Sequence, residues 1–72
     1  MKLEISWRLR GGFMRAFISN SCLGEVDMKP HDTGQFCWRY KDGNGAWRTG
    51  FSFGVLESVM TVEELINSHH EW

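Results

Sequence analysis

The chain is poor in cysteine and has no long apolar run. Cys22 and Cys37 are its only cysteines, and two are too few for the disulfide framework that holds many small secreted domains together. Residues 1–4 mix apolar with charged side chains, and the apolar segment 13–18 is interrupted by Arg15. The sequence therefore predicts neither a signal peptide nor a membrane span. We expect reduced thiols, a cytoplasmic location and no membrane partner.

A strong net charge is also missing, but charge is segregated along the chain. The formal net charge is −1 for 72 residues, of which 42% are hydrophobic and 14% aromatic. This composition is typical of a single small globular domain, 1–72, with marginal stability of its own. Residues 1–20 sum to +3 and residues 35–54 to +2, whereas residues 21–34 sum to −2 and residues 55–72 to −4. This segregation is more informative than the total charge.

A first β-hairpin is predicted over residues 3–19. Apolar and polar side chains alternate through residues 3–10, which is the period of a strand with one apolar face. Gly11-Gly12 follows, and glycines accept the positive φ that two-residue hairpin turns require. Such a turn matches the apolar faces of both strands by pairing Leu9 with Met14, Trp7 with Ala16 and Ile5 with Ile18.

A second hairpin is predicted over residues 35–53, with aromatic strands on both sides of a glycine-rich turn. A loop of two or four residues, with its tip at 44–45 or 43–44, brings the aromatic sets of both strands to one face. A three-residue loop would instead set the aromatics of the first strand opposite Arg48 and Ser52. The even loop is therefore expected, and it places on one face Phe36, Trp38, Tyr40, Trp47, Thr49, Phe51 and Phe53.

The remaining segments predict a loop and a helix. Segment 20–34 shows no sustained period and is interpreted as a loop with at most a short edge strand. A helix is predicted over about 61–71, because Thr61 can serve as its N-cap and Glu64 can close a capping box. The predicted fold is α+β: a small antiparallel sheet of two β-hairpins, about four strands, packed against one C-terminal helix.

Basic side chains gather on the predicted solvent face of the two hairpins. In the first hairpin Arg8 lies opposite Arg15. Like charges directly across a ladder are destabilising unless an anion or a neighbouring acid neutralises them. Arginine beside exposed phenylalanine suits phosphate contacts with base stacking, and equally an acidic protein surface. A solvated face that protects strand edges is the third reading. The candidate partner-binding residues are Arg8, Arg10, Phe13, Arg15, Phe17, Arg39, Lys41 and Arg48.

Metal-binding and catalytic patterns are weak. Zinc could in principle be held by Cys22, His31 and Cys37 with His69 or His70, but the sequence contains neither a C-x-x-C knuckle nor an H-x-x-x-H pair. Hydroxyl, imidazole and carboxylate groups near the expected loop match no catalytic arrangement. We therefore expect no metal, no cofactor and no enzymatic activity.

One resemblance to a known family covers about half of the chain. Segment 36–47, followed by a helix that opens with Thr61, Glu63 and Glu64, resembles the arm-type DNA-binding domain at the start of phage tyrosine recombinases. The resemblance implies a sheet-plus-helix fold that binds DNA.

Two functions follow as hypotheses. The first is a non-catalytic protein-binding module, such as a stand-alone inhibitor or adaptor encoded by a phage or mobile element, that acts on a larger protein. The second is a nucleic-acid-binding domain. The acidic C-terminal segment favours the first, because a free duplex binder of this size usually carries net positive charge. A homo-oligomer is compatible with both.

Overall fold

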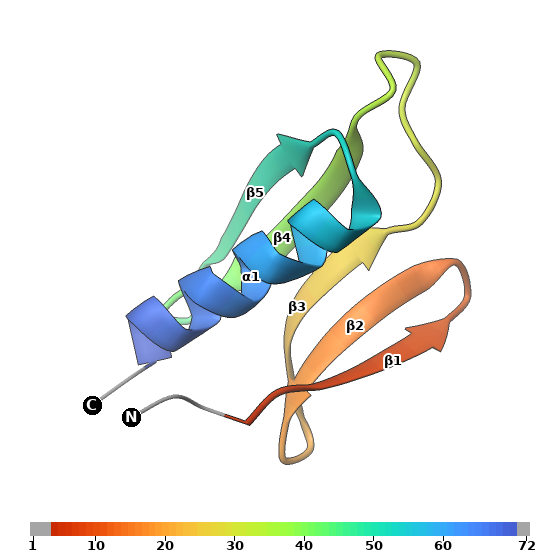
Figure 1. Cartoon of the computed structure of the whole chain (residues 1–72). Coiled ribbons are helices and arrows are strands. Elements are labelled where there is room, and N and C mark those ends of the chain that lie inside the picture. Colours follow the sequence, from red (N-terminus) through yellow and green to blue (C-terminus); the bar gives the residue numbers. More distant parts are fainter. Residues whose placement is uncertain (1–3, 71–72) are drawn as a thin grey trace.

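The computed structural model describes residues 4–70 and consists of one antiparallel sheet covered on one face by one helix (Figure 1). The sheet has five strands in the order β1-β2-β3-β4-β5, so each strand pairs with its neighbours in sequence. The α+β class is thus confirmed, with one strand more than predicted. The elements are β1 Ser6–Arg10, β2 Phe13–Ile18, β3 Ser21–Asp27, β4 Phe36–Lys41, β5 Trp47–Ser52 and α1 Val55–His70.

The β1–β2 hairpin forms as predicted. Gly11 and Gly12 have φ angles of 62° and 83°, which is the positive-φ pair of a type I′ turn. This turn sets Leu9 opposite Met14 and Trp7 opposite Ala16, and β1 begins one residue after Ile5. The predicted register is therefore confirmed over the length of the ladder.

Strand β3 corrects the prediction of a loop over 20–34. It lies at the centre of the sheet, paired with both β2 and β4, and a loop remains only between Asp27 and Phe36. The sequence pattern hides it for two reasons. The register shifts so that Leu23 is an extra residue between Cys22 and Gly24, as in a β-bulge.

Gly24 is the second reason, because it contributes no apolar side chain to the alternation. A Cβ atom on Gly24 would lie 2.6 Å from Cγ1 of Val62 in the helix. The glycine therefore lets α1 approach the centre of the sheet closely.

The β4–β5 hairpin has the odd loop, so the predicted even loop is wrong. The Asp42 N–H donates to the Ala46 carbonyl, and the Gly45 N–H donates to the Asp42 carbonyl. Gly45 has a positive φ of 83°. This is a three-residue loop with a bulge at the glycine. The Asp42 carboxylate fixes it by accepting the N–H groups of Asn44 at 2.8 Å and Ala46 at 3.0 Å.

The odd loop sends the aromatics of β4 and β5 to opposite faces. Trp38 lies opposite Gly50, and Tyr40 lies opposite Arg48. A Cβ atom on Gly50 would lie 2.3 Å from the Trp38 ring, so the indole occupies the space that a side chain would fill. Trp38 also donates a 3.0 Å hydrogen bond from Nε1 to Ser52 Oγ. Trp47 and Phe51 consequently face away from the helix.

Helix α1 begins at Val55, so the prediction of an N-cap at Thr61 is wrong. The Gly54 carbonyl accepts the backbone N–H of Ser58 at 3.0 Å and its hydroxyl at 2.8 Å. The helix starts here because an apolar stripe with helical spacing already begins at Val55. The stripe continues to Val62 and Ile66, which are fully buried in the core with Ala16, Val26 and Tyr40.

The helix lies across β3, β4 and β5 (Figure 1). Polar contacts also join the sides of the helix to the sheet. Trp7 Nε1 donates to Glu63 Oε2 at 2.6 Å, Tyr40 hydrogen-bonds with His69 at 3.3 Å, and His70 donates to the Lys41 carbonyl at 2.6 Å. Within residues 4–70, no helix is long and apolar enough to cross a membrane.

Candidate functional site

The face of the sheet that points away from α1, here called the open face, carries most of the predicted binding residues. Its members alternate along each strand with residues of the opposite face, the one on which α1 lies, and they lie opposite one another in the strand registers. It comprises Arg8, Arg10, Phe13, Arg15, Phe17, Cys22, Glu25, Asp27, Cys37, Arg39, Lys41, Trp47, Thr49 and Phe51.

Arg48 is the predicted residue that the structure separates from this group. The odd hairpin loop turns it to the opposite face, across from Tyr40. Its Nε donates to Asp42 Oδ2 at 2.9 Å. This bond, with those from backbone N–H groups, lowers the pKa of Asp42 from 3.8 to about 2, and the carboxylate raises the pKa of Arg48. Arg48 therefore stabilises its own hairpin.

Glu25 is the acid that neutralises positive charge at the arginine-rich centre of the open face. It lies opposite both Arg15 and Arg39 in the two ladders of β3. Arg39 Nε donates to Glu25 Oε1 at 2.8 Å, and Arg15 Nε forms an ion pair with Oε2 at 3.2 Å. Because Arg8 lies directly across from Arg15, this carboxylate offsets the repulsion between them. The sequence prediction missed Glu25 because β3 was assigned to a loop.

Four cations of the open face lie over aromatic rings. In the β1–β2 hairpin, Arg8 Cζ lies 4.7 Å from the centre of the Phe17 ring, and Arg15 Cζ lies 5.9 Å from the centre of the Phe13 ring. In the β4–β5 hairpin, Arg39 Cζ and Lys41 Nζ lie 4.6 Å and 5.7 Å from the centre of the Trp47 ring. These distances allow cation–π attraction, which is worth about 0.5–1 kcal/mol at exposed sites. The rings thus hold the cations in place while donors remain available to a ligand.

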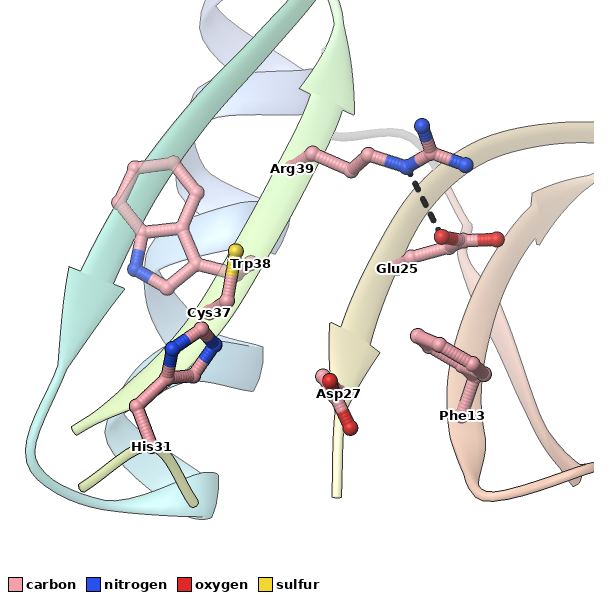
Figure 2. Close-up of a pocket in the computed structure, with 7 residues that line it drawn as sticks. All are labelled: Phe13, Glu25, Asp27, His31, Cys37, Trp38 and Arg39. Carbon is pink, nitrogen blue, oxygen red and sulfur yellow. Dashed lines mark hydrogen bonds and ion pairs between the residues drawn. The ribbon is translucent and has the colours of Figure 1, made fainter. Parts of the chain in front are cut away.

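A hollow of about 260 Å³ lies at one end of the open face (Figure 2). In this view Asp27 lies between His31 and Phe13, and the hydrogen-bonded Arg39–Glu25 pair lies above them. Asp27 already accepts the backbone N–H of Lys29 at 3.0 Å. The residues that line the hollow are Phe13, Glu25, Asp27, His31, Cys37, Trp38 and Arg39.

His31 and Cys37 both line this hollow. The His31 ring meets the Phe51 ring edge-on at 5.4 Å between centres. Burial and, to a lesser degree, the charge of Asp27 raise the pKa of the Cys37 thiol, against a smaller opposite effect from Arg39. A raised pKa reduces the thiolate fraction and thus the reactivity of the thiol.

The residues considered for zinc are divided between the two sides of the sheet. Cys22, His31 and Cys37 lie on the side of the open face, whereas His69 and His70 contact β4 from the helix. Among the described residues, no three histidine, cysteine or acidic side chains are grouped so that they could hold a metal ion.

Comparison of the chain with known protein families, with curated proteins and with solved structures finds no match. The similarity to the arm-type DNA-binding domain of phage tyrosine recombinases therefore stays an interpretation of the sequence.

The open face was predictable in part from the sequence. The β1–β2 alternation reveals Arg8, Arg10 and Arg15 on one face. Glu25 and Asp27 flank the buried Val26, so this short alternation is the signal for β3 that was available. Trp47 and Phe51 were predicted on the same face as Trp38 and Tyr40 because the loop parity was wrong.

Proposed function

We propose that this protein is a binding module whose open face holds an acidic surface of a larger protein. The observation that carries the proposal is the set of cations lying over aromatic rings, with Arg15 and Arg39 joined through Glu25. Arginine and aromatic side chains are the groups most often found at the energetic centres of protein interfaces.

Pre-organisation supports a binding role over a merely solvated surface. A free arginine loses side-chain entropy when it binds, at about 0.5–1.5 kcal/mol per immobilised side chain. On the open face Arg39 is already held between the Glu25 carboxylate and the Trp47 ring. Much of this loss is thus incurred on folding rather than on binding.

The position of the carboxylates favours a protein partner over nucleic acid. Glu25 and Asp27 lie on the central strand β3, between the cations of β1–β2 and those of β4. A phosphate backbone crossing from one basic group to the other would pass both acids. A protein surface can instead place a hydrogen-bond donor or a cation against Asp27.

Nucleic acid is the second candidate, and the exposed rings of β5 favour it. Trp47 and Phe51 are 39% and 50% exposed, and exposed rings next to cations can stack bases of a single strand. Salt dependence separates the two candidates, because phosphate contacts release counterions and make affinity fall steeply with salt.

The test removes cations from the open face and compares ligand classes. The variant Arg8→Ser/Arg10→Ser/Lys41→Ser is titrated with random-sequence single-stranded DNA, duplex DNA and RNA, and with an acidic peptide containing aromatic residues. Each titration is run at two salt concentrations. Lys29→Ser is the control, because this exposed cation lies outside the strands.

We expect the acidic peptide to bind the wild type and Lys29→Ser, and to bind the triple variant at least tenfold more weakly. Salt-sensitive binding of generic nucleic acid that disappears in the triple variant would replace the proposal by its alternative. If the wild type and the triple variant bind the peptide equally and bind each nucleic acid equally, both functions are refuted for this surface.

A further inference from the structure

The two edges of the sheet differ in their protection against pairing. Edge strand β1 places Arg8 and Arg10 on the open face, and such charges discourage another strand from adding to an edge. Edge strand β5, Trp47–Ser52, has no proline, and its one charged residue, Arg48, is held by Asp42. The β5 edge is therefore the one left available for pairing.

The hydrogen-bonding groups along the β5 edge can be assigned from its pairing with β4. Asp42 N–H donates to the Ala46 carbonyl. In an antiparallel ladder every second residue bonds to the same neighbour, so residues 46, 48 and 50 direct their backbone groups to β4. The backbone N–H and C=O groups of Trp47, Thr49 and Phe51 consequently point outward from the sheet.

We propose that β5 pairs antiparallel with β5 of a second copy of this chain, about a twofold axis at Thr49. In this register Thr49 faces Thr49, and Trp47 faces Phe51 of the other copy. All three outward-pointing residues then satisfy their backbone groups within the pair. Aromatic pairs and threonine pairs across strands are favourable contacts, each worth a few tenths of a kcal/mol or more.

The other face of the ladder fits the same register. Arg48 lies opposite Gly50 of the other copy, and a glycine has no side chain to obstruct the arginine. A shift of the register by one residue would set residues of the open face against residues of the covered face, so the two sheets would not continue each other.

Pairing of this kind closes as a dimer and does not lead to fibres. A twofold contact uses the same strand of both copies, so no β5 edge remains. The outer edges of the joined sheet are then the two β1 strands, which carry Arg8 and Arg10. The contact leaves these arginines uncovered, so partner binding by Arg8 and Arg10 and pairing at β5 can be tested separately.

The test measures mass by sedimentation equilibrium from micromolar to millimolar protein. The wild type should reach twice the 8.4 kDa mass of the chain. Thr49→Lys sets two lysines against each other at the axis, and Thr49→Glu two glutamates, so each variant alone should stay at 8.4 kDa. An equimolar mixture should recover the dimer with one copy of each variant. Thr49→Val, which is β-branched and uncharged, should dimerise as the wild type does.

A wild type that stays at 8.4 kDa up to millimolar concentration would overturn the inference. A dimeric Thr49→Lys would show that another surface is used, and a mixture that stays monomeric would overturn the register. Hydrogen exchange of the wild type gives a measurement that needs no variant. Exchange of the Thr49 and Phe51 amides should slow as protein concentration rises, and unchanged exchange would contradict pairing at β5.

Discussion

The two faces of the sheet differ in what their side chains do: one face packs against the helix, and the other carries charged and aromatic residues. Under the helix, Val26, Val62 and Ile66 are fully buried, and Gly24 and Gly50 leave space for Val62 and the Trp38 ring. The open face instead carries paired charges and stacked cations, most of them accessible to solvent. Stability should therefore depend on one face and binding on the other, and substitutions should separate the two.

The largest loss of stability is expected from Ile66→Ala. Truncating a fully buried isoleucine removes apolar contacts and leaves a cavity, which lowers the free energy of unfolding by about 2–5 kcal/mol. That is a large share of the stability of a small domain. Urea denaturation measures the change. Leu56→Ala in the same helix is the control, because Leu56 is 72% exposed, and its change should stay within about 0.5 kcal/mol. Equal losses would contradict the assigned helix face.

Gly50→Ala should have the next largest effect. Its methyl group would meet the Trp38 ring at 2.3 Å, and overpacking of this kind lowers the free energy of unfolding by about 1–3 kcal/mol. Near-ultraviolet circular dichroism should report the displaced indole. Trp38→Phe replaces the indole by a smaller ring, so the loss in free energy of unfolding of the double variant should be smaller than the sum of the two single losses. Strict additivity would place Trp38 away from Gly50.

Asp42 gives a smaller effect that depends on pH. Its pKa is lowered from 3.8 to about 2, so the folded state favours the carboxylate. The resulting stabilisation is complete above about pH 4 and is lost as the pH falls through about 2. The difference in melting temperature between the wild type and Asp42→Asn should therefore narrow over this range. A difference that stays constant from pH 7 to pH 2 would exclude this role.

The smallest effect on stability is expected on the open face. Arg8→Ser removes an exposed cation that lies over Phe17, but it also removes the repulsion from Arg15 on the opposite strand. The two effects oppose each other, so the free energy of unfolding should change by less than about 0.5 kcal/mol. Thermal unfolding of this variant should overlay that of the wild type. A loss comparable with that of Ile66→Ala would mean that the open face also carries stability, and the contrast between the faces would fail.

The sequence was sufficient where a backbone preference and a side-chain period agree. Gly11-Gly12 selects a two-residue turn, and the alternation on both sides of it demands the same register. The second hairpin was not predictable in this way. Its register depends on the Asp42 carboxylate, which accepts N–H groups from within the loop, and on the space above Gly50. Neither feature can be recognised from the alternation of apolar and polar residues.

The errors at β3 and α1 have related causes. At β3, Gly24 and the extra residue Leu23 interrupt the alternation that identifies a strand. At α1, Thr61 with Glu64 matches a capping box although both lie inside the helix, while the true start follows Gly54. The error at β3 is why Glu25 was missed in the candidate site, whereas the wrong loop parity of the second hairpin placed Arg48 on the wrong face.

The order of the elements along the chain has a consequence for folding kinetics. Each strand pairs with its sequence neighbours, so the sheet is built from local contacts that form quickly. The helix that covers it comes last, and until the helix docks the apolar side of the sheet faces water. We expect helix docking to follow the rate-limiting step, so that Ile66→Ala accelerates unfolding and leaves the refolding rate almost unchanged. Slower refolding of this variant in stopped-flow fluorescence would show that the helix docks before that step.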